Sequence, residues 1–361
     1  MRITAKHKIT LLLFCIMVLL ILSLSCGKSN PVTSEEITPG RRDYTWTVDT
    51  LDMPVNQIHS IWGSSPSDIW ACGPAGDESK WFQHYDGKKW TPYNISYSGN
   101  TLFGFSRNDV WMGSGDGQIW HYDGVSWKRN YTYKADNGRN LVEVMNIWGS
   151  SPNDVYASGV MFYKGTVYEP ESNRGFILHY DGQEWTEVLK GEFNSQFATI
   201  RKFNNEVFVQ SYSFDLKRSY DDQIVFYKLS GNKLEKIYSG LHGVINFADF
   251  DLVGDNLYFW IGRDICSYSE RMGLSKENFL KIFTVNEPMF NYYVFGRSMK
   301  DLFISTLGGL AHYNGEDVQY ILHYPDTQRI VAGTLFFEKE IVCAFVDYST
   351  NTNMVVHGKL K

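Results

Sequence analysis

Positive charge is scarce in this sequence. Lysine and arginine number 34 against 40 aspartate and glutamate residues, and the 361-residue chain has a net charge of −6. Proteins that bind nucleic acids neutralise phosphates with clustered lysine and arginine, so this balance argues against DNA or RNA as a partner. Only 20% of the residues are charged, whereas 43% are hydrophobic and 16% are aromatic. That composition excludes a disordered chain and indicates a folded protein.

Cysteines are also few. Cys15 and Cys26 lie near the N-terminus, which leaves Cys72, Cys266 and Cys343, an odd number without metal-ligand spacing. Each of these three lies in an apolar segment, so we expect buried free thiols. A disulfide between Cys72 and Cys343 would require their two strands to be neighbours. The chain also lacks a Ser-His-Asp arrangement, a cysteine nucleophile motif and a redox motif.

The hydrophobic run near the N-terminus is too short to span a membrane. Leu11–Leu22 comprises twelve consecutive apolar residues, and Arg2, Lys6 and Lys8 precede it. A transmembrane helix needs about 20 apolar residues, whereas a basic start followed by a run of this length is typical of a signal peptide. The sequence therefore predicts a signal peptide over residues 1–25.

The residues after this run carry a second signal. The letters LSLSCG at 22–27 resemble the lipobox of bacterial lipoproteins, with Ser23 at a position where leucine is usual. The resemblance implies cleavage before Cys26, lipidation of its thiol and a protein anchored in the bacterial cell envelope. We expect it at the outer membrane, on the periplasmic or the surface-exposed face. Residues 26–43 are rich in Pro, Gly, Ser and Thr and predict a flexible tether before a domain at 44–361.

The domain is built from a repeat with two recurring motifs. A ten-residue motif reads IWGSSPSDIW at 61–70, LFGFSRNDVW at 102–111 and IWGSSPNDVY at 147–156. A second motif reads HYDGKKW at 84–90, HYDGVSW at 121–127 and HYDGQEW at 179–185. Ser-Ser-Pro and Asp-Gly are turn sequences, and alternating aromatic and β-branched residues flank both. Each unit therefore predicts four short strands, here called A, B, C and D.

The spacing of the repeat predicts the number of units. The acidic or asparagine residue before strand B recurs at Asp68, Asp109, Asp154, Glu206, Asn256, Asp301 and Glu340. Seven such residues, 39 to 52 positions apart, predict an all-β, seven-bladed β-propeller of four-stranded antiparallel blades. Only 21 residues follow Glu340, which leaves no room for a fourth strand there. Tyr44–Val48 supplies a matching strand, so we expect the N-terminal strand to close the ring (3+1).

These motifs resemble those of exported bacterial β-propeller proteins with IWGSSPxDVW…HYDGxxW repeats, over about residues 58–190. The resemblance implies a fold and an export route, and it does not imply one activity, because propellers serve as enzymes, scaffolds and binders alike.

The repeated side chains favour structural roles over catalytic ones. We interpret the eleven tryptophans as core between blades, with a carbohydrate-stacking platform as the alternative. His84, His121 and His179 recur in different blades, so we expect structural hydrogen bonds and no metal. We interpret their neighbours Asp86, Asp123 and Asp181 as turn residues. The segment at 249–255 has acidic residues but not the 12-residue ligand pattern of a calcium loop; we therefore expect no cofactor and leave calcium open.

Loop length points to a binding surface. The B–C and D–A loops lie on one face of a propeller, and variable loops on a rigid scaffold are common binding sites. The longest predicted B–C insertions are 158–175 and 211–223. With the D–A loop before blade 3 they carry a tyrosine- and arginine-rich set: Tyr131, Tyr133, Tyr163, Tyr168, Arg174, Tyr212, Arg218 and Tyr220. Tyrosine and arginine suit recognition of an acidic or polyhydroxylated partner.

Together these features predict a lipid-anchored, monomeric propeller that binds or scaffolds a protein or glycan and is not an enzyme. A polysaccharide-active enzyme, lyase or glycosidase, and the sensory propeller of a signalling system remain the alternatives.

Overall fold

The structure is a computed structural model. The chain divides into two units, residues 1–38 and 39–361. The residues that it describes are 40–53, 57–74, 80–93, 98–134, 141–165, 170–213, 223–241, 248–262, 264–269, 273–276, 294–306, 309–324 and 329–361. The predicted signal peptide, Cys26 and most of the tether lie outside these residues. Every helix or strand within them is a β-strand, and none of these residues forms a helix that could cross a membrane.

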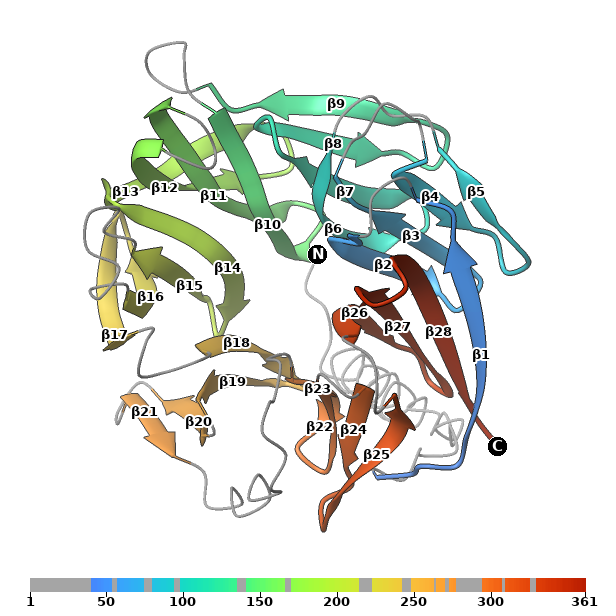
Figure 1. The fold of residues 1–361 in the computed structure, drawn as a ribbon. Helices are drawn as coiled ribbons and strands as arrows, with labels where there is room; N and C mark the ends of the chain where they lie inside the picture. The colour runs from blue at the N-terminus through green and yellow to red at the C-terminus, as the bar shows by residue number, and fades with distance from the viewer. Residues whose placement is uncertain are drawn as a thin grey trace, which may run out of the picture. The chain divides into compact units, whose positions relative to one another are not determined.

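The strands form seven four-stranded antiparallel sheets, which confirms the predicted fold (Figure 1). Blade 1 consists of β2 (Ser60–Ser65), β3 (Asp68–Cys72), β4 (Phe82–Tyr85) and β5 (Trp90–Pro92). Blade 2 consists of β6 (Gly99–Ser106), β7 (Asp109–Ser114), β8 (Gln118–Tyr122) and β9 (Trp127–Thr132). Blade 3 consists of β10 (Leu141–Ser151), β11 (Asp154–Gly165), β12 (Pro170–Tyr180) and β13 (Trp185–Phe193).

The second half of the chain keeps the same strand order. Blade 4 consists of β14 (Ser195–Phe203), β15 (Glu206–Ser213), β16 (Gln223–Ser230) and β17 (Lys233–Leu241). Blade 5 consists of β18 (Ala248–Val253), β19 (Asn256–Ile261), β20 (Asp264–Ser269) and β21 (Gly273–Lys276). Blade 6 consists of β22 (Val294–Ser298), β23 (Asp301–Thr306), β24 (Gly309–Tyr313) and β25 (Val318–His323). Blade 7 consists of β26 (Arg329–Phe336), β27 (Glu340–Asp347), β28 (Thr352–Leu360) and β1 (Tyr44–Leu51).

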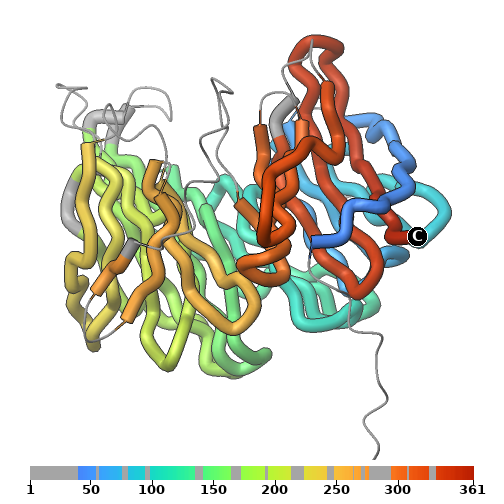
Figure 2. Tube along the Cα trace, turned by 90° about the horizontal axis from the view of Figure 1, so that it is seen from below, coloured from blue at the N-terminus to red at the C-terminus, as the bar shows by residue number. Residues whose placement is uncertain are grey.

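The blades close into a ring through their first strands. β2, β6, β10, β14, β18, β22 and β26 each contact the next one, and β26 contacts β2 again. All seven residues used to count the blades are the first residue of a second strand, from Asp68 in β3 to Glu340 in β27. Figure 2 shows the strands running between two faces of the ring. One, the turn face, carries the A–B and C–D turns; the other, the loop face, carries the B–C and D–A connections.

The N-terminal strand completes the last blade, as predicted. β1 pairs with β28 along its whole length, from Tyr44↔Leu360 to Leu51↔Asn353. This pairing covers an edge of β28 that would otherwise expose unpaired backbone groups.

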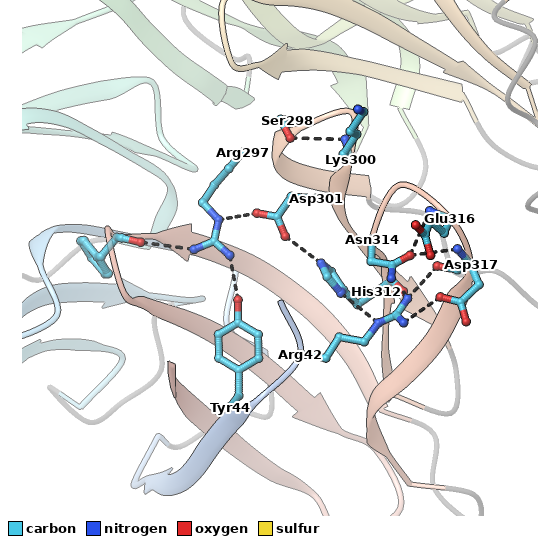
Figure 3. Close-up of polar contacts among 11 residues, drawn as sticks. Arg42, Tyr44, Arg297, Ser298, Lys300, Asp301, His312, Asn314, Glu316 and Asp317 are labelled. Carbon is cyan, nitrogen blue, oxygen red and sulfur yellow. Dashed lines mark hydrogen bonds and ion pairs between the residues drawn. The ribbon is translucent and has the colours of Figure 1, made fainter. Parts of the chain in front are cut away.

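The residues before β1 fasten this strand to blade 6 (Figure 3). Arg42 donates hydrogen bonds to the Asp317 carboxylate at 2.7 Å and to the carbonyl oxygens of Asp317 at 2.6 Å and His312 at 2.9 Å. Its Nε also donates to His312 Nδ1 at 3.3 Å. Because an arginine only donates, Nδ1 of His312 is an acceptor. Nε2 therefore carries the proton and donates to Asp301 at 2.7 Å.

The hydroxyl of Tyr44 extends the same network. It accepts a hydrogen bond of 2.7 Å from Arg297, whose Nε donates to Asp301 at 2.5 Å. We call this set the N-terminal latch: Arg42, Tyr44, Arg297, Asp301, His312 and Asp317. It joins the closing strand of blade 7 to the neighbouring blade.

The core lies between the blades. Each described hydrophobic cluster joins two neighbouring blades, as in the cluster that holds Trp70 of blade 1 and Trp127 of blade 2. Trp70, Trp81 and Trp111 are each only 2% exposed, which confirms for them the predicted role in the core. The free thiols of Cys72, Cys266 and Cys343 are buried, as expected, and none forms a disulfide.

Candidate functional site

The predicted tyrosine-rich surface is described only in part. Tyr168, Arg218 and Tyr220 lie outside the described residues. Tyr133 is 5% exposed, stacks on Phe176 at 4.2 Å between ring centroids and donates a hydrogen bond to the Glu187 carboxylate. Tyr131 is half-buried, and its ring centroid lies 6.4 Å from that of Trp185 in the next blade. These two tyrosines contribute to the packing between blades 2 and 3.

The described part of the first predicted B–C insertion is not a loop. Residues 158–165 continue β11, residues 170–175 belong to β12, and the two strands stay paired as far as Gly165↔Pro170. The prediction of a loop was wrong because extra residues in a B–C connection lengthen both strands when their backbone groups can still pair. Tyr163 is half-buried, with its hydroxyl 3.8 Å from Met161 Sδ, and Arg174 donates to the carbonyl of Gly191.

In blade 4, β15 continues to Ser213 and β16 begins at Gln223. The hydroxyl of Tyr212 accepts a hydrogen bond of 3.1 Å from Gln210, and its ring packs against the core of blades 4 and 5. The five described residues of the predicted set therefore take part in packing within or between blades 2 to 5. Binding by this surface stays a prediction.

The recurring histidines have the structural role that we expected. His84 Nε2 lies 2.7 Å from the Asp68 carboxylate, and the equivalent distances in blades 2 and 3 are 2.8 and 2.9 Å. His312 and Asp301 form a fourth such pair in blade 6. The histidine on strand C thus fixes the first residue of strand B in each of these blades.

The Asp-Gly turns also match the prediction. The carboxylate of Asp86 accepts hydrogen bonds from the backbone N–H groups of Lys88 and Lys89, at 2.9 and 3.0 Å. Those bonds hold the pKa of Asp86 below its usual range. Asp123 and Asp181 make the same two bonds in blades 2 and 3. Gly87 follows with a φ of 88°, which a glycine adopts without strain.

The acidic segment at 249–255 is held by an arginine. Both carboxylate oxygens of Asp251 accept from Arg201, at 2.6 and 3.1 Å. Burial, followed by the charge of Asp251, raises the pKa of Asp249 to about 6. In the described ranges no three His, Cys, Asp or Glu side chains gather as metal ligands. The pair of Arg201 and Asp251 is therefore an ion pair between the inner strands of blades 4 and 5.

A concave site among the described residues lies where the ring closes. It is a groove of about 600 Å³ between blades 7 and 1, at the turn face. We call it the closure groove. Its walls come from β1, β27, β28 and the two turns of blade 1: Thr45, Thr47, Pro66, Ser67, Tyr85, Gly87, Glu340, His357, Lys359, Leu360 and Lys361.

A change in the repeat coincides with this groove. The third residue of strand B is aromatic in the first six blades: Trp70, Trp111, Tyr156, Phe208, Tyr258 and Phe303. In blade 7 the same position is Val342, which is fully buried. Glu340 lies two residues earlier, on the same side of β27, and lines the groove. The groove therefore borders the place where blade 7 lacks a ring.

His357 shows the same departure from the repeat. It pairs with Val342 in the ladder, as His84 pairs with Trp70. Glu340 forms an ion pair of 3.0 Å with Lys359, and His357 Nε2 instead lies 3.4 Å from Asp49 Oδ2. Burial lowers the pKa of His357, so its imidazole is neutral at pH 7. The ring forms one wall of the groove, 5.2 Å from the ring of Tyr85.

This groove was not predicted from the sequence. Its signal was present in the sequence as the single aliphatic residue at the third position of strand B. This residue stands out only when the second half of the repeat is aligned residue by residue. The prediction of the later blades depended on the spacing of the repeat alone.

No protein-family model matches the chain, and no curated protein matches it. Solved structures do. The structure of YCF48 bound to D1 peptide has a TM-score of 0.57 and 13% identity, over 90% of this chain and 99% of that one. The WD40 β-propeller domain of Doa1 has a TM-score of 0.54 and 10% identity, over 88% of this chain and 97% of that one.

A third similar structure is the extracellular domain of the putative hybrid two-component system BT3049 from B. thetaiotaomicron. It has a TM-score of 0.55 and 11% identity, over 86% of this chain and 42% of that one. At such identities these likenesses establish the propeller fold and no shared activity.

Proposed function

We propose that this chain is a non-enzymatic binding propeller, held at the bacterial envelope by a lipid on Cys26, and that a protein partner docks in the closure groove. The observation that carries the proposal is the groove itself. Rigid strands of two blades form its walls, and hydroxyl, imidazole, carboxylate and ammonium groups line it beside an apolar leucine and proline. Mixed polar and apolar concavities of this kind suit specific recognition.

The polar groups of the repeat support binding over catalysis. In blade 1, Ser64, Asp68 and His84 are within hydrogen-bonding distance in the order serine, aspartate, histidine. Ser64 donates to one Asp68 oxygen at 2.5 Å, and His84 bonds the other at 2.7 Å. In a hydrolase the histidine must contact the serine to remove its proton. Here the carboxylate separates the two, so the serine hydroxyl is not activated.

Among the similar folds, one structure is of YCF48 bound to D1 peptide. That peptide is a ligand of YCF48. It supports a protein partner here only as an example of what this fold can hold.

Site-specific photo-crosslinking tests the proposal. A diazirine amino acid is placed at Thr47, which lines the groove, and at Val48, its neighbour on the opposite side of β1. We expect irradiation of cells to give one protein adduct through position 47 and none through position 48, because a docked partner lies within reach of one side of the strand only. Mass spectrometry of the adduct identifies the partner peptide.

A third diazirine position, Lys134 on the loop face, completes the design. Protein adducts through Lys134 and not through Thr47 would move the site to the loop face that the sequence predicted. Release of sugars from envelope glycans by the purified full chain would contradict a non-enzymatic role.

A further inference from the structure

We propose that the closure groove receives an aromatic side chain of the partner, a tryptophan or a tyrosine, beside the position where blade 7 lacks its own ring. The proposal rests on the function proposed above and names the chemistry that the groove recognises.

Two other junctions show what this position holds when the repeat is complete. Between blades 1 and 2 the ring of Trp70 lies 4.1 Å from His84 of its own blade and 5.2 Å from Tyr122 of the next. It also meets Trp127 of the next blade edge-on at 5.4 Å. Trp70 is therefore enclosed by a histidine, a tyrosine and a tryptophan.

The junction of blades 2 and 3 repeats this arrangement. Trp111 lies 4.1 Å from His121, 5.1 Å from Tyr180 and 5.5 Å from Trp185. The three enclosing side chains thus belong to the repeat and are not particular to one blade.

Between blades 7 and 1 the same three side chains are present without the ring that they enclose. His357, Tyr85 and Trp90 occupy the equivalent positions, and the rings of Tyr85 and Trp90 lie 5.2 Å apart. The central residue is Val342. Tyr85 and Trp90 pack against the core cluster that contains Val342. Tyr85 lies 5.2 Å from His357, and the groove opens beside these two rings on the turn face.

The groove offers an incoming ring both stacking and hydrogen bonding. His357 and Tyr85 line the groove, and aromatic side chains stack on rings of these types. Carboxylates lie close by, and Asp49 already accepts a hydrogen bond of 3.0 Å from the indole N–H of Trp90. An entering ring that carries its own donor is therefore favoured over phenylalanine, and a tryptophan or tyrosine meets this requirement.

The neighbouring tether does not supply the ring. Residues 27–39 read GKSNPVTSEEITP and contain no aromatic residue. We therefore assign the ring to a partner, because tryptophan and tyrosine are enriched among the residues that dominate protein interfaces.

Ligand-observed ¹⁹F NMR with the purified full chain tests this inference. The probe is the N-acetyl amide of 5-fluorotryptophan, and the comparison compound is the N-acetyl amide of 5-fluoroleucine. We expect saturable line broadening of the first compound only, because the groove recognises a ring with a donor and not apolar bulk.

A matched pair of variants locates the binding. Thr47→Trp places an indole in the groove and should weaken probe binding by at least about tenfold. Val48→Trp introduces the same side chain on the opposite side of β1, where Val48 is 51% exposed, and should leave binding within about twofold of the parent. Thermal unfolding of both variants verifies that they are folded.

Equal broadening of the leucine compound, or equal effects of the two variants, would overturn the inference. These results are distinct from those of the crosslinking experiment. A protein adduct at position 47 together with no binding of the tryptophan probe would support the proposed binding function and contradict the inference of an aromatic ligand.

Discussion

The pairs of aspartate and histidine in blades 1, 2, 3 and 6 show how one interaction fixes a turn. The aspartate begins strand B, the histidine lies on strand C, and their distances range from 2.7 to 2.9 Å. Their structural role was predictable. Residues that recur once per blade are separated around the ring, so each pair can form hydrogen bonds within its own blade but cannot form a common site with the others. The role of Asp249 was not predictable, because its burial and its arginine neighbour come from strands far apart in the sequence.

Asp249 provides a prediction of pH dependence. Burial raises its pKa from an ordinary 3.8 to about 6, while its oxygen accepts from the hydroxyl of Thr199 at 3.1 Å and from the backbone N–H of Phe250 at 2.8 Å. Between these pH values the unfolded chain is ionised and the folded chain still holds the proton, so stability falls as the pH rises. Asp249→Asn removes this pH-dependent loss of stability, because asparagine does not ionise. Its side-chain oxygen still accepts the hydrogen bonds from Thr199 and Phe250.

We therefore expect Asp249→Asn to match the parent below about pH 4 and to exceed it by on the order of 1 to 2 kcal/mol above pH 6, measured by urea unfolding. Asp255→Asn, at an exposed position on the turn of the same blade, is the control and should change little at any pH. A gain in Asp249→Asn of equal size at pH 4 and pH 7.5 would show that burial of its charge is not the cause.

At the scale of elements, the hairpin of β11 and β12 is the clearest departure from expectation. A long B–C segment was interpreted as a loop because its length varied between blades. Length alone does not distinguish a loop from two longer strands. In blade 3 the pairing of β11 with β12 continues past the last pair with β10, Leu141↔Phe162, through Tyr163↔Ser172 to Gly165↔Pro170, so these extra residues form strands.

The closing strand provides a second prediction. Deletion of residues 44–51 removes all eight ladder positions of β1 and exposes the edge of β28, so we expect the melting temperature to fall by at least roughly 5 °C. Deletion of residues 27–39, which lies before Arg42 and leaves the latch intact, should have no effect. Calorimetry of the two deletions measures the difference, and equal melting temperatures would contradict closure by β1.

At the scale of the whole molecule, the sequence was sufficient for the blade count and for closure. Both depend on local turn chemistry, which recurs in each repeat, and on Tyr44–Val48, whose residue pattern matches that of a fourth strand. The closure groove was not predicted, because it depends on which side chains of blade 7 meet those of blade 1. These residues lie at opposite ends of the chain, as Glu340 and Tyr85 illustrate.

The sequence predicts that a lipid on Cys26 anchors the whole molecule in a membrane. We expect Cys26→Ser to abolish incorporation of labelled palmitate in the native-type host and to release the protein from membranes, because the thiol is the predicted lipid acceptor. Cys15→Ser, which changes a cysteine within the predicted signal peptide, is the matched control and should keep both the label and the membrane association. Labelling that persists in Cys26→Ser would contradict the lipoprotein interpretation.

The N-terminal latch also determines where the domain yields under a mechanical load. Tension that enters through the N-terminal segment reaches Arg42 before it reaches the first ladder pair, Tyr44↔Leu360. Arg42 and Tyr44 transfer that load to His312, Asp317 and Arg297 of blade 6. The first ladder pair of β1 and β28 therefore separates only after these side-chain contacts with blade 6 have broken.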